Sequence, residues 1–122
     1  MSDKGILLAI VEQGGYPDFT RLYEKLGYEV VVIKTMRKVI QYLKKNTPRV
    51  IVAEFNFQSD FRDRTSSLES LIAVLQQRSG TRLVVLYDQE YLHQLERLQQ
   101  QFGPDEILPF PIDAARLERI LR

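Results

Sequence analysis

The chain has 122 residues, no cysteine and a formal net charge of +1, from 17 lysines and arginines against 16 aspartates and glutamates. This length suffices for one domain, residues 1–122, and is too short for two. The missing cysteines exclude disulfides, thiolate metal sites and thiol nucleophiles, and the balanced charge gives no general attraction to nucleic acid or to an anionic membrane. Because the apolar runs are only strand-sized and no signal-peptide pattern begins the chain, we expect a cytoplasmic domain.

Strand and helix patterns alternate through the first half of the chain. Residues 6–11 are a continuous apolar run, typical of a buried strand. A helix is expected to begin near Pro17 and to end at Gly27. Residues 29–33 predict a second strand, and Thr35 is a suitable N-cap for the helix that follows it.

The same alternation continues to the end of the chain. Three more strands are predicted, at residues 50–53, 82–86 and 106–108, each followed by a helical pattern. The polar segment 57–65 is long for a connection between a strand and a helix. Five strand–helix units predict a parallel sheet covered by helices on both faces. We therefore expect a five-stranded, doubly wound, flavodoxin-like α/β fold with strand order 2-1-3-4-5.

The candidate site follows from this fold. In open parallel sheets, ligands bind beyond the carboxyl ends of the strands. Glu54 is the first polar residue after the strand at 50–53, and Glu12 follows the first strand. We expect both carboxylates at the same edge of the sheet. Gly14 and Gly15 match no phosphate-binding fingerprint and are expected to form an ordinary loop.

The order and spacing of these units resemble the receiver domain of two-component response regulators over essentially the whole chain. The resemblance is carried by LGYEVV after the first helix, by Pro48 before a strand that ends at a carboxylate, and by the tail GPDEILPFPIDAARLERIL. It implies four reactive roles. An Asp after the third strand accepts a phosphoryl group, an acidic pair after the first holds Mg²⁺, a Thr or Ser follows the fourth, and a Lys precedes the Pro after the fifth.

This chain departs from the receiver pattern at the positions of those roles. Glu54 stands at the acceptor position, and its extra methylene moves the carboxylate by more than about 1 Å, which can cost ~10²-fold in positioned chemistry. Glu12 is the only carboxylate after the first strand, Tyr87 replaces the Thr or Ser, and Phe110 replaces the Lys, whereas Asn56 is compatible with the pattern. The sequence is similar to a degenerate receiver, a pseudo-receiver, for which we expect no metal, no cofactor and no catalysis.

The leading hypothesis is a non-catalytic signalling or scaffold module that works by protein–protein contact and is independent of aspartyl phosphorylation. Glu54 is then either a fixed charge that imitates a phosphate or a relic. The resemblance implies that the fourth helix, fifth strand and fifth helix bind a protein partner or a second copy. The expected contact residues are Tyr91, Phe102, Phe110 and Pro111.

Two alternatives stay open. One is a receiver that is still phosphorylated at an atypical acceptor, such as Glu54, Asp60 or Asp63. The other is a domain that binds a small ligand at the carboxyl ends of the strands. A solvated surface is expected for five basic residues around the second helix: Arg37, Lys38, Lys44, Lys45 and Arg49.

Overall fold

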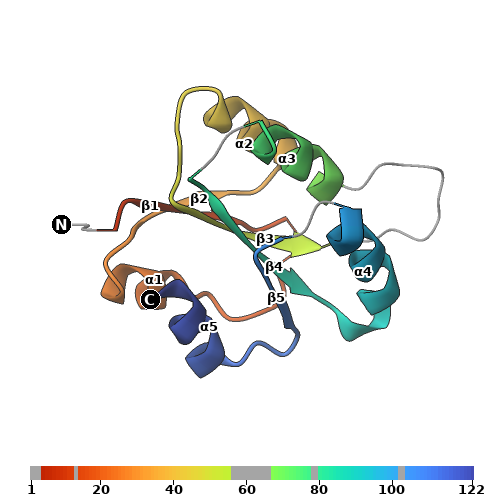
Figure 1. The fold of residues 1–122 in the computed structure, drawn as a ribbon. Helices are drawn as coiled ribbons and strands as arrows, with labels where there is room; N and C mark the ends of the chain where they lie inside the picture. Colours follow the sequence, from red (N-terminus) through yellow and green to blue (C-terminus); the bar gives the residue numbers. More distant parts are fainter. Residues whose placement is uncertain (1–3, 13, 56–66, 78–79, 102–103) are drawn as a thin grey trace.

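A computed structural model describes residues 4–12, 14–55, 67–77, 80–101 and 104–122. The protein is a three-layer α/β domain in which a five-stranded parallel sheet, ordered β2-β1-β3-β4-β5, lies between two layers of helices (Figure 1). The predicted fold class and strand order are confirmed.

Each strand leads through a helix to the next strand. The strands are β1 (Ile6–Ile10), β2 (Glu29–Ile33), β3 (Val50–Phe55), β4 (Arg82–Tyr87) and β5 (Glu106–Pro109). The helices are α1 (Thr20–Lys25), α2 (Met36–Leu43), α3 (Ser67–Leu75), α4 (Leu92–Gln101), which follows the short 3₁₀ helix η1 (Gln89–Tyr91), and α5 (Ala114–Leu121).

Side-chain caps set the starts of α2, as the sequence predicts, and of α5, but the start of α1 differs from the prediction. The Thr35 side chain accepts a hydrogen bond from the Lys38 amide at α2, and Asp113 caps α5 in the same way. The helix expected near Pro17 begins only at Thr20, because the Asp18 carboxylate accepts the amide and hydroxyl hydrogens of Thr20 at 2.9 and 2.6 Å. The residues before α1 therefore remain a loop.

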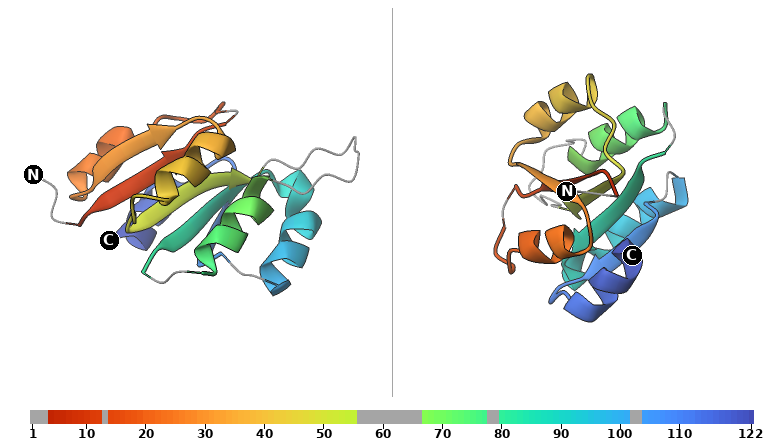
Figure 2. Two further views of the ribbon diagram at one scale, coloured as in Figure 1. Left: turned by 90° about the horizontal axis from the view of Figure 1, so that it is seen from above. Right: turned by 90° about the vertical axis from the view of Figure 1, so that its left-hand side faces the viewer.

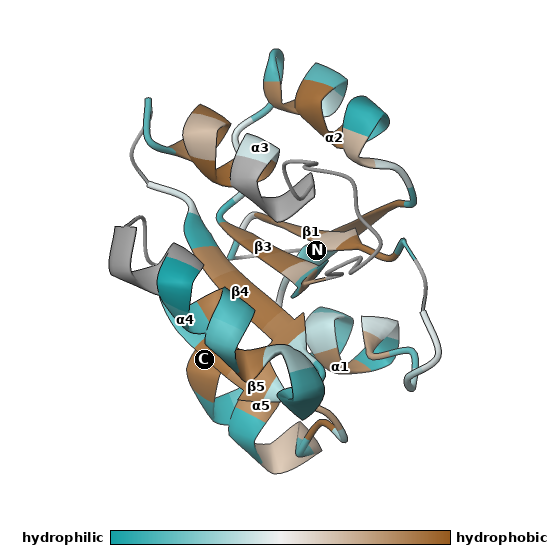
Figure 3. Ribbon diagram, turned by 90° about the vertical axis from the view of Figure 1, so that its right-hand side faces the viewer, coloured by the Kyte–Doolittle hydropathy of each residue, from teal (hydrophilic) through white to brown (hydrophobic). Residues whose placement is uncertain are grey.

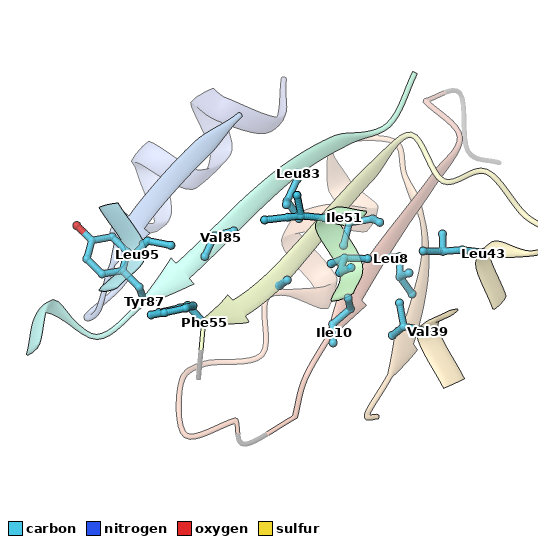
Figure 4. Packing of buried hydrophobic residues seen from close by; sticks show 13 residues of the cluster. Leu8, Ile10, Val39, Leu43, Ile51, Phe55, Leu83, Val85, Tyr87 and Leu95 are labelled. Carbon is cyan, nitrogen blue, oxygen red and sulfur yellow. The ribbon is translucent and has the colours of Figure 1, made fainter. Parts of the chain in front are cut away.

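The core is divided by the sheet into two clusters. One lies under α2, α3 and α4 and includes Leu8, Ile51, Val85 and Leu95 (Figure 4). The other lies under α1 and α5 and includes Leu7, Val50, Val52, Leu86 and Leu117. The two layers of helices are seen on opposite sides of the sheet in Figure 2. Successive side chains of β3 point alternately into the two clusters, and because both faces are covered, every residue of this strand is buried.

Hydropathy follows these layers. The strands are apolar along most of their length, and the helices place polar residues on their outer sides (Figure 3). Within the described part of the chain, no helix combines the length and the apolar character needed to cross a membrane.

Candidate functional site

Glu54 lies inside the protein near the carboxyl end of β3. Its exposed fraction is 4%, and it is the one buried polar or charged residue among those that the structure describes. In the register of the sheet it is beside Leu86 of β4, which belongs to the cluster under α1 and α5. Burying an ionised carboxylate is costly unless hydrogen bonds replace its lost water, so its partners decide what the site can do.

Two donors from the loop between β1 and α1 hold the same carboxylate oxygen. The Tyr16 hydroxyl donates a hydrogen bond to Glu54 Oε2 at 2.8 Å, and the Gly14 amide donates to it at 3.2 Å. Gly14 and Gly15 have φ angles of +69° and +84°, which a residue with a Cβ rarely adopts. The two glycines let the backbone turn its amide toward the buried charge.

Tyr16 is in turn held by Phe110, in the connection between β5 and α5. The two rings lie with their centroids 5.2 Å apart and tilted by 31°, a favourable aromatic arrangement. Burial, together with the hydrogen bond to Glu54 and the Glu54 charge, raises the pKa of Tyr16 far above its ordinary value. The hydroxyl therefore keeps its proton at neutral pH and acts as a donor. Phe110, at the position where a receiver has Lys, forms a wall behind this donor.

The structure brings together only some of the predicted site residues. Tyr87 lies beside Phe55 in the sheet and packs in the cluster under α2, α3 and α4, near Leu95 (Figure 4). It is therefore on the opposite face of the sheet from Glu54. Glu12 follows β1 and is partly buried. Asn56, and with it Asp60 and Asp63, lies outside the described residues.

The predicted partner surface spans the edge of the sheet formed by β5. Tyr91 is partly buried against the cluster under α4, Phe110 is partly buried on the other face, and Pro111 is exposed. The peptide bond between Phe110 and Pro111 is cis. Phe102 lies outside the described residues. Among the residues that are described, the exposed large hydrophobic side chain is Val32, far from this surface at the other edge strand.

Sequence reasoning missed Tyr16. The available signal was a tyrosine directly after two glycines, in the loop that leaves β1 at the edge where Glu54 was expected. That signal carries no spacing rule, because the hydroxyl meets a carboxylate 38 residues away.

Comparison with solved structures bears on the fold. The signal receiver domain of an HD domain-containing protein from Pseudomonas fluorescens Pf-5 is similar with a TM-score of 0.77 at 16% identity, over 100% of this chain and 87% of that one. A response regulator receiver domain protein from Clostridium thermocellum gives 0.75 at 17% identity, over 96% and 90%. The protein has the receiver fold. Chemotaxis response regulator CheY4 of Vibrio cholerae is also similar, with a TM-score of 0.73 at 18% identity over 96% and 95% of the two chains.

No protein-family model and no curated protein matches the sequence. At these low identities the likeness to solved structures concerns the receiver fold alone, so the chemistry of the site has to be judged from its own residues.

Those residues do not fit a magnesium ion. Mg²⁺ requires several oxygen ligands in near-octahedral geometry. Glu54 Oε2 already accepts hydrogen bonds from Tyr16 and Gly14, so two donors occupy the surroundings of this oxygen. In the part of the chain that the structure describes, no three His, Asp or Glu side chains gather closely enough to hold a metal ion.

Proposed function

We propose that this protein is a non-catalytic signalling or scaffold module with the receiver fold, which acts by protein–protein contact and does not depend on aspartyl phosphorylation. The observation that carries the proposal is the internal satisfaction of Glu54. The carboxylate at the acceptor position is buried, and its Oε2 is hydrogen-bonded to the protein's own Tyr16 and Gly14.

The chemistry of phosphoryl transfer supports this proposal. The reaction needs an accessible nucleophile in line with the donor and a cation that neutralises the developing charge. Glu54 is 4% exposed, and its surroundings do not fit Mg²⁺. The phenyl ring of Phe110 offers no charge-assisted bond to a phosphate. These three features argue against phosphoryl transfer at Glu54.

The same contacts connect the Glu54 site to the proposed binding surface. Glu54 in β3 holds Tyr16 of the loop after β1, and Tyr16 packs on Phe110 between β5 and α5. This chain of contacts joins the buried charge to the edge formed by α4, β5 and α5. We propose that a protein partner or a second copy binds this edge in its one fixed arrangement, with Tyr91, Phe110 and Pro111 in or beside the contact.

A phosphorylation assay tests the first half of the proposal. The protein is incubated with acetyl phosphate and Mg²⁺, and its intact mass is compared with that of a sample without phosphodonor. We expect no covalent phosphoryl adduct. An adduct that depends on Mg²⁺, whether on Glu54 or on an Asp of the segment 57–65, would overturn the proposal and favour a receiver with an atypical acceptor.

A pull-down from a lysate of the source organism tests the second half. Wild type, Glu54→Gln, Tyr16→Phe and the control Tyr42→Phe, altered on α2 away from the site, are compared by mass spectrometry. A partner that binds wild type and the control but is lost with Glu54→Gln makes the carboxylate a fixed signal. The same partner on all four proteins makes the domain a scaffold with a relic site. Failure of wild type to capture any protein or to self-associate would contradict the proposal.

A further inference from the structure

A cavity lies at the amino-terminal edge of the sheet, opposite to the Glu54 site. Its volume is about 520 Å³, within the ~300–1,000 Å³ usual for ligand pockets. It is bounded by segments that precede strands, at Lys4, Tyr28, Arg49 and Asp105, and by Arg82 at the start of β4 and Arg122 beyond α5. The right-hand view of Figure 2, seen from the side of the N-terminus, shows the end of α5 on the same side as the starts of the strands.

Positive charge dominates the walls of this cavity. Lys4, Arg49, Arg82 and Arg122 line it together with the carboxylate of Asp105. Glu118 pairs with Arg122, which leaves Lys4, Arg49 and Arg82 as three cations against Asp105, whereas the whole chain carries only +1. Asp105 Oδ2 accepts a hydrogen bond from the Leu83 amide at 2.7 Å. One oxygen of the Asp105 carboxylate is therefore already hydrogen-bonded to the backbone.

Contacts with the end of α5 hold some of these cations in place. Arg82 Nη1 donates to the Ile120 carbonyl at 3.0 Å, and Arg122 pairs with Glu118. Such contacts reduce the freedom that a guanidinium would lose on binding a ligand.

Tyr28 forms the apolar wall between the cations. Its hydroxyl donates to the Leu121 carbonyl at 2.6 Å, and Lys4 Nζ lies 5.5 Å from its ring centroid. Burial raises the pKa of Tyr28, and the charges of Arg82 and Arg49 act on it in the opposite direction. Both guanidinium groups are therefore within electrostatic reach of the same hydroxyl.

We propose that this cavity binds a small anion carrying two or more phosphate groups, either free or as part of a nucleotide. Guanidinium forks match the geometry of phosphate oxygens and bond to them in pairs. Cations gathered around one cavity repel each other, and a bound polyanion removes that repulsion. The site is independent of the Glu54 site and does not rest on the proposed signalling function.

A second positively charged cavity provides the control. A groove of about 760 Å³ beside β2 and α2 is lined by Lys34, Lys38, Lys44 and Lys45. β2 is an edge strand, and lysines beside an edge strand have a structural role, because they discourage pairing with other chains. Their ammonium groups are also mobile point charges without the planar fork of arginine. The arginine cavity is therefore the better phosphate site.

Calorimetric titration of the whole chain tests this proposal. Pyrophosphate and ADP are titrated separately, without divalent cations, into wild type, Arg49→Gln and Lys45→Gln. Arg49 and Lys45 are both exposed, and each variant removes one positive charge. The backbone bonds of residue 49, to Ile6 and from Arg82, remain in Arg49→Gln. We expect binding to wild type and to Lys45→Gln, and an affinity for Arg49→Gln about tenfold or more lower.

The two probes separate the sources of the ligand. Equal affinity for pyrophosphate and ADP supports recognition of the phosphate groups alone, and a higher affinity for ADP supports a nucleotide. Amide NMR shifts should be concentrated at Lys4, Thr81 and Arg82. Absence of binding by both probes, equal loss in both variants, or shifts concentrated at residues 34–46 would each overturn the proposal.

Discussion

At the carboxyl edge of the sheet the buried charge is negative and is satisfied by the protein's own donors, whereas at the amino edge the charges are positive and face a cavity. Glu54 has 4% exposure and two hydrogen bonds from one loop. Lys4, Arg49 and Arg82 line the other edge with one carboxylate, Asp105, while Arg122 is paired with Glu118. The comparison shows that a charged residue at a strand end does not make an available site. What matters is whether the chain itself supplies the partner.

Removing the whole Tyr16 side chain should have the largest effect on stability, because it acts at the carboxyl edge of the sheet. Tyr16→Ala deletes the hydrogen bond to Glu54 and the ring contact with Phe110, and we expect the free energy of unfolding to fall by about 3 kcal/mol. Urea unfolding followed by circular dichroism measures this change. A loss below about 1 kcal/mol would mean that Tyr16 does not close the edge.

Removing only the hydroxyl should have a smaller effect. Tyr16→Phe keeps the ring against Phe110 but leaves Glu54 Oε2 with one fewer donor, and hydrogen bonds to charged groups contribute about 1.5–3 kcal/mol. Tyr42→Phe, at a partly buried tyrosine of α2 whose ring stays against the core, should change stability less than Tyr16→Phe does. Comparable losses in the two variants would show that the hydrogen bond to Glu54 has no special weight.

Alkaline pH gives a third way to sharpen the comparison. The pKa of Tyr16 is raised in the folded protein, first by burial and then by Glu54, whereas an unfolded tyrosine ionises near pH ~10. Above that pH the unfolded chain binds fewer protons, so the stabilisation present below pH ~10 is lost as pH rises. The pKa of Tyr23 is raised in the same way. Because Tyr23 is present in both wild type and Tyr16→Phe, it does not affect the comparison between them. Urea midpoints should therefore fall less steeply with pH in Tyr16→Phe than in wild type, and parallel profiles would contradict the assignment.

The smallest effect on stability is expected at the amino edge of the sheet. Arg49 is exposed, so Arg49→Gln should change stability by less than about 0.5 kcal/mol in phosphate-free buffer. With pyrophosphate present, wild type should gain thermal stability and the variant should gain less, because a ligand that binds only the native state stabilises it. An equal gain in both proteins would remove the distinction between the two edges.

The sequence was sufficient to predict the architecture because that depends on patterns local in the chain. The buried run before Glu54 and the alternation of strands and helices indicate a parallel sheet, and parallel sheets have few topologies. The position of Glu54 at the carboxyl edge followed from the same pattern. Tyr87 was predicted beside it, but alternation along β4 turns that side chain to the other face.

The contacts of the site could not be predicted in this way. Tyr16 lies in the loop before α1, which begins at Thr20 after the Asp18 bonds, whereas a proline at position 17 suggested an earlier helix start. Arg49 reads in sequence as part of the basic surface around α2, yet the fold assigns it to the cavity at the amino edge. Both depend on loops that meet only after the sheet has formed.

The last turn of α5 has a further consequence. The carbonyls of Ile120 and Leu121 accept hydrogen bonds from Arg82 of β4 and from Tyr28 before β2, whereas such groups at most helix ends face water and fray. Opening this turn alone would break bonds to the sheet, so it should unfold together with the central strands as one cooperative unit. Its amides are then expected to exchange with deuterium at rates closer to those of β4 than to those of a fraying terminus.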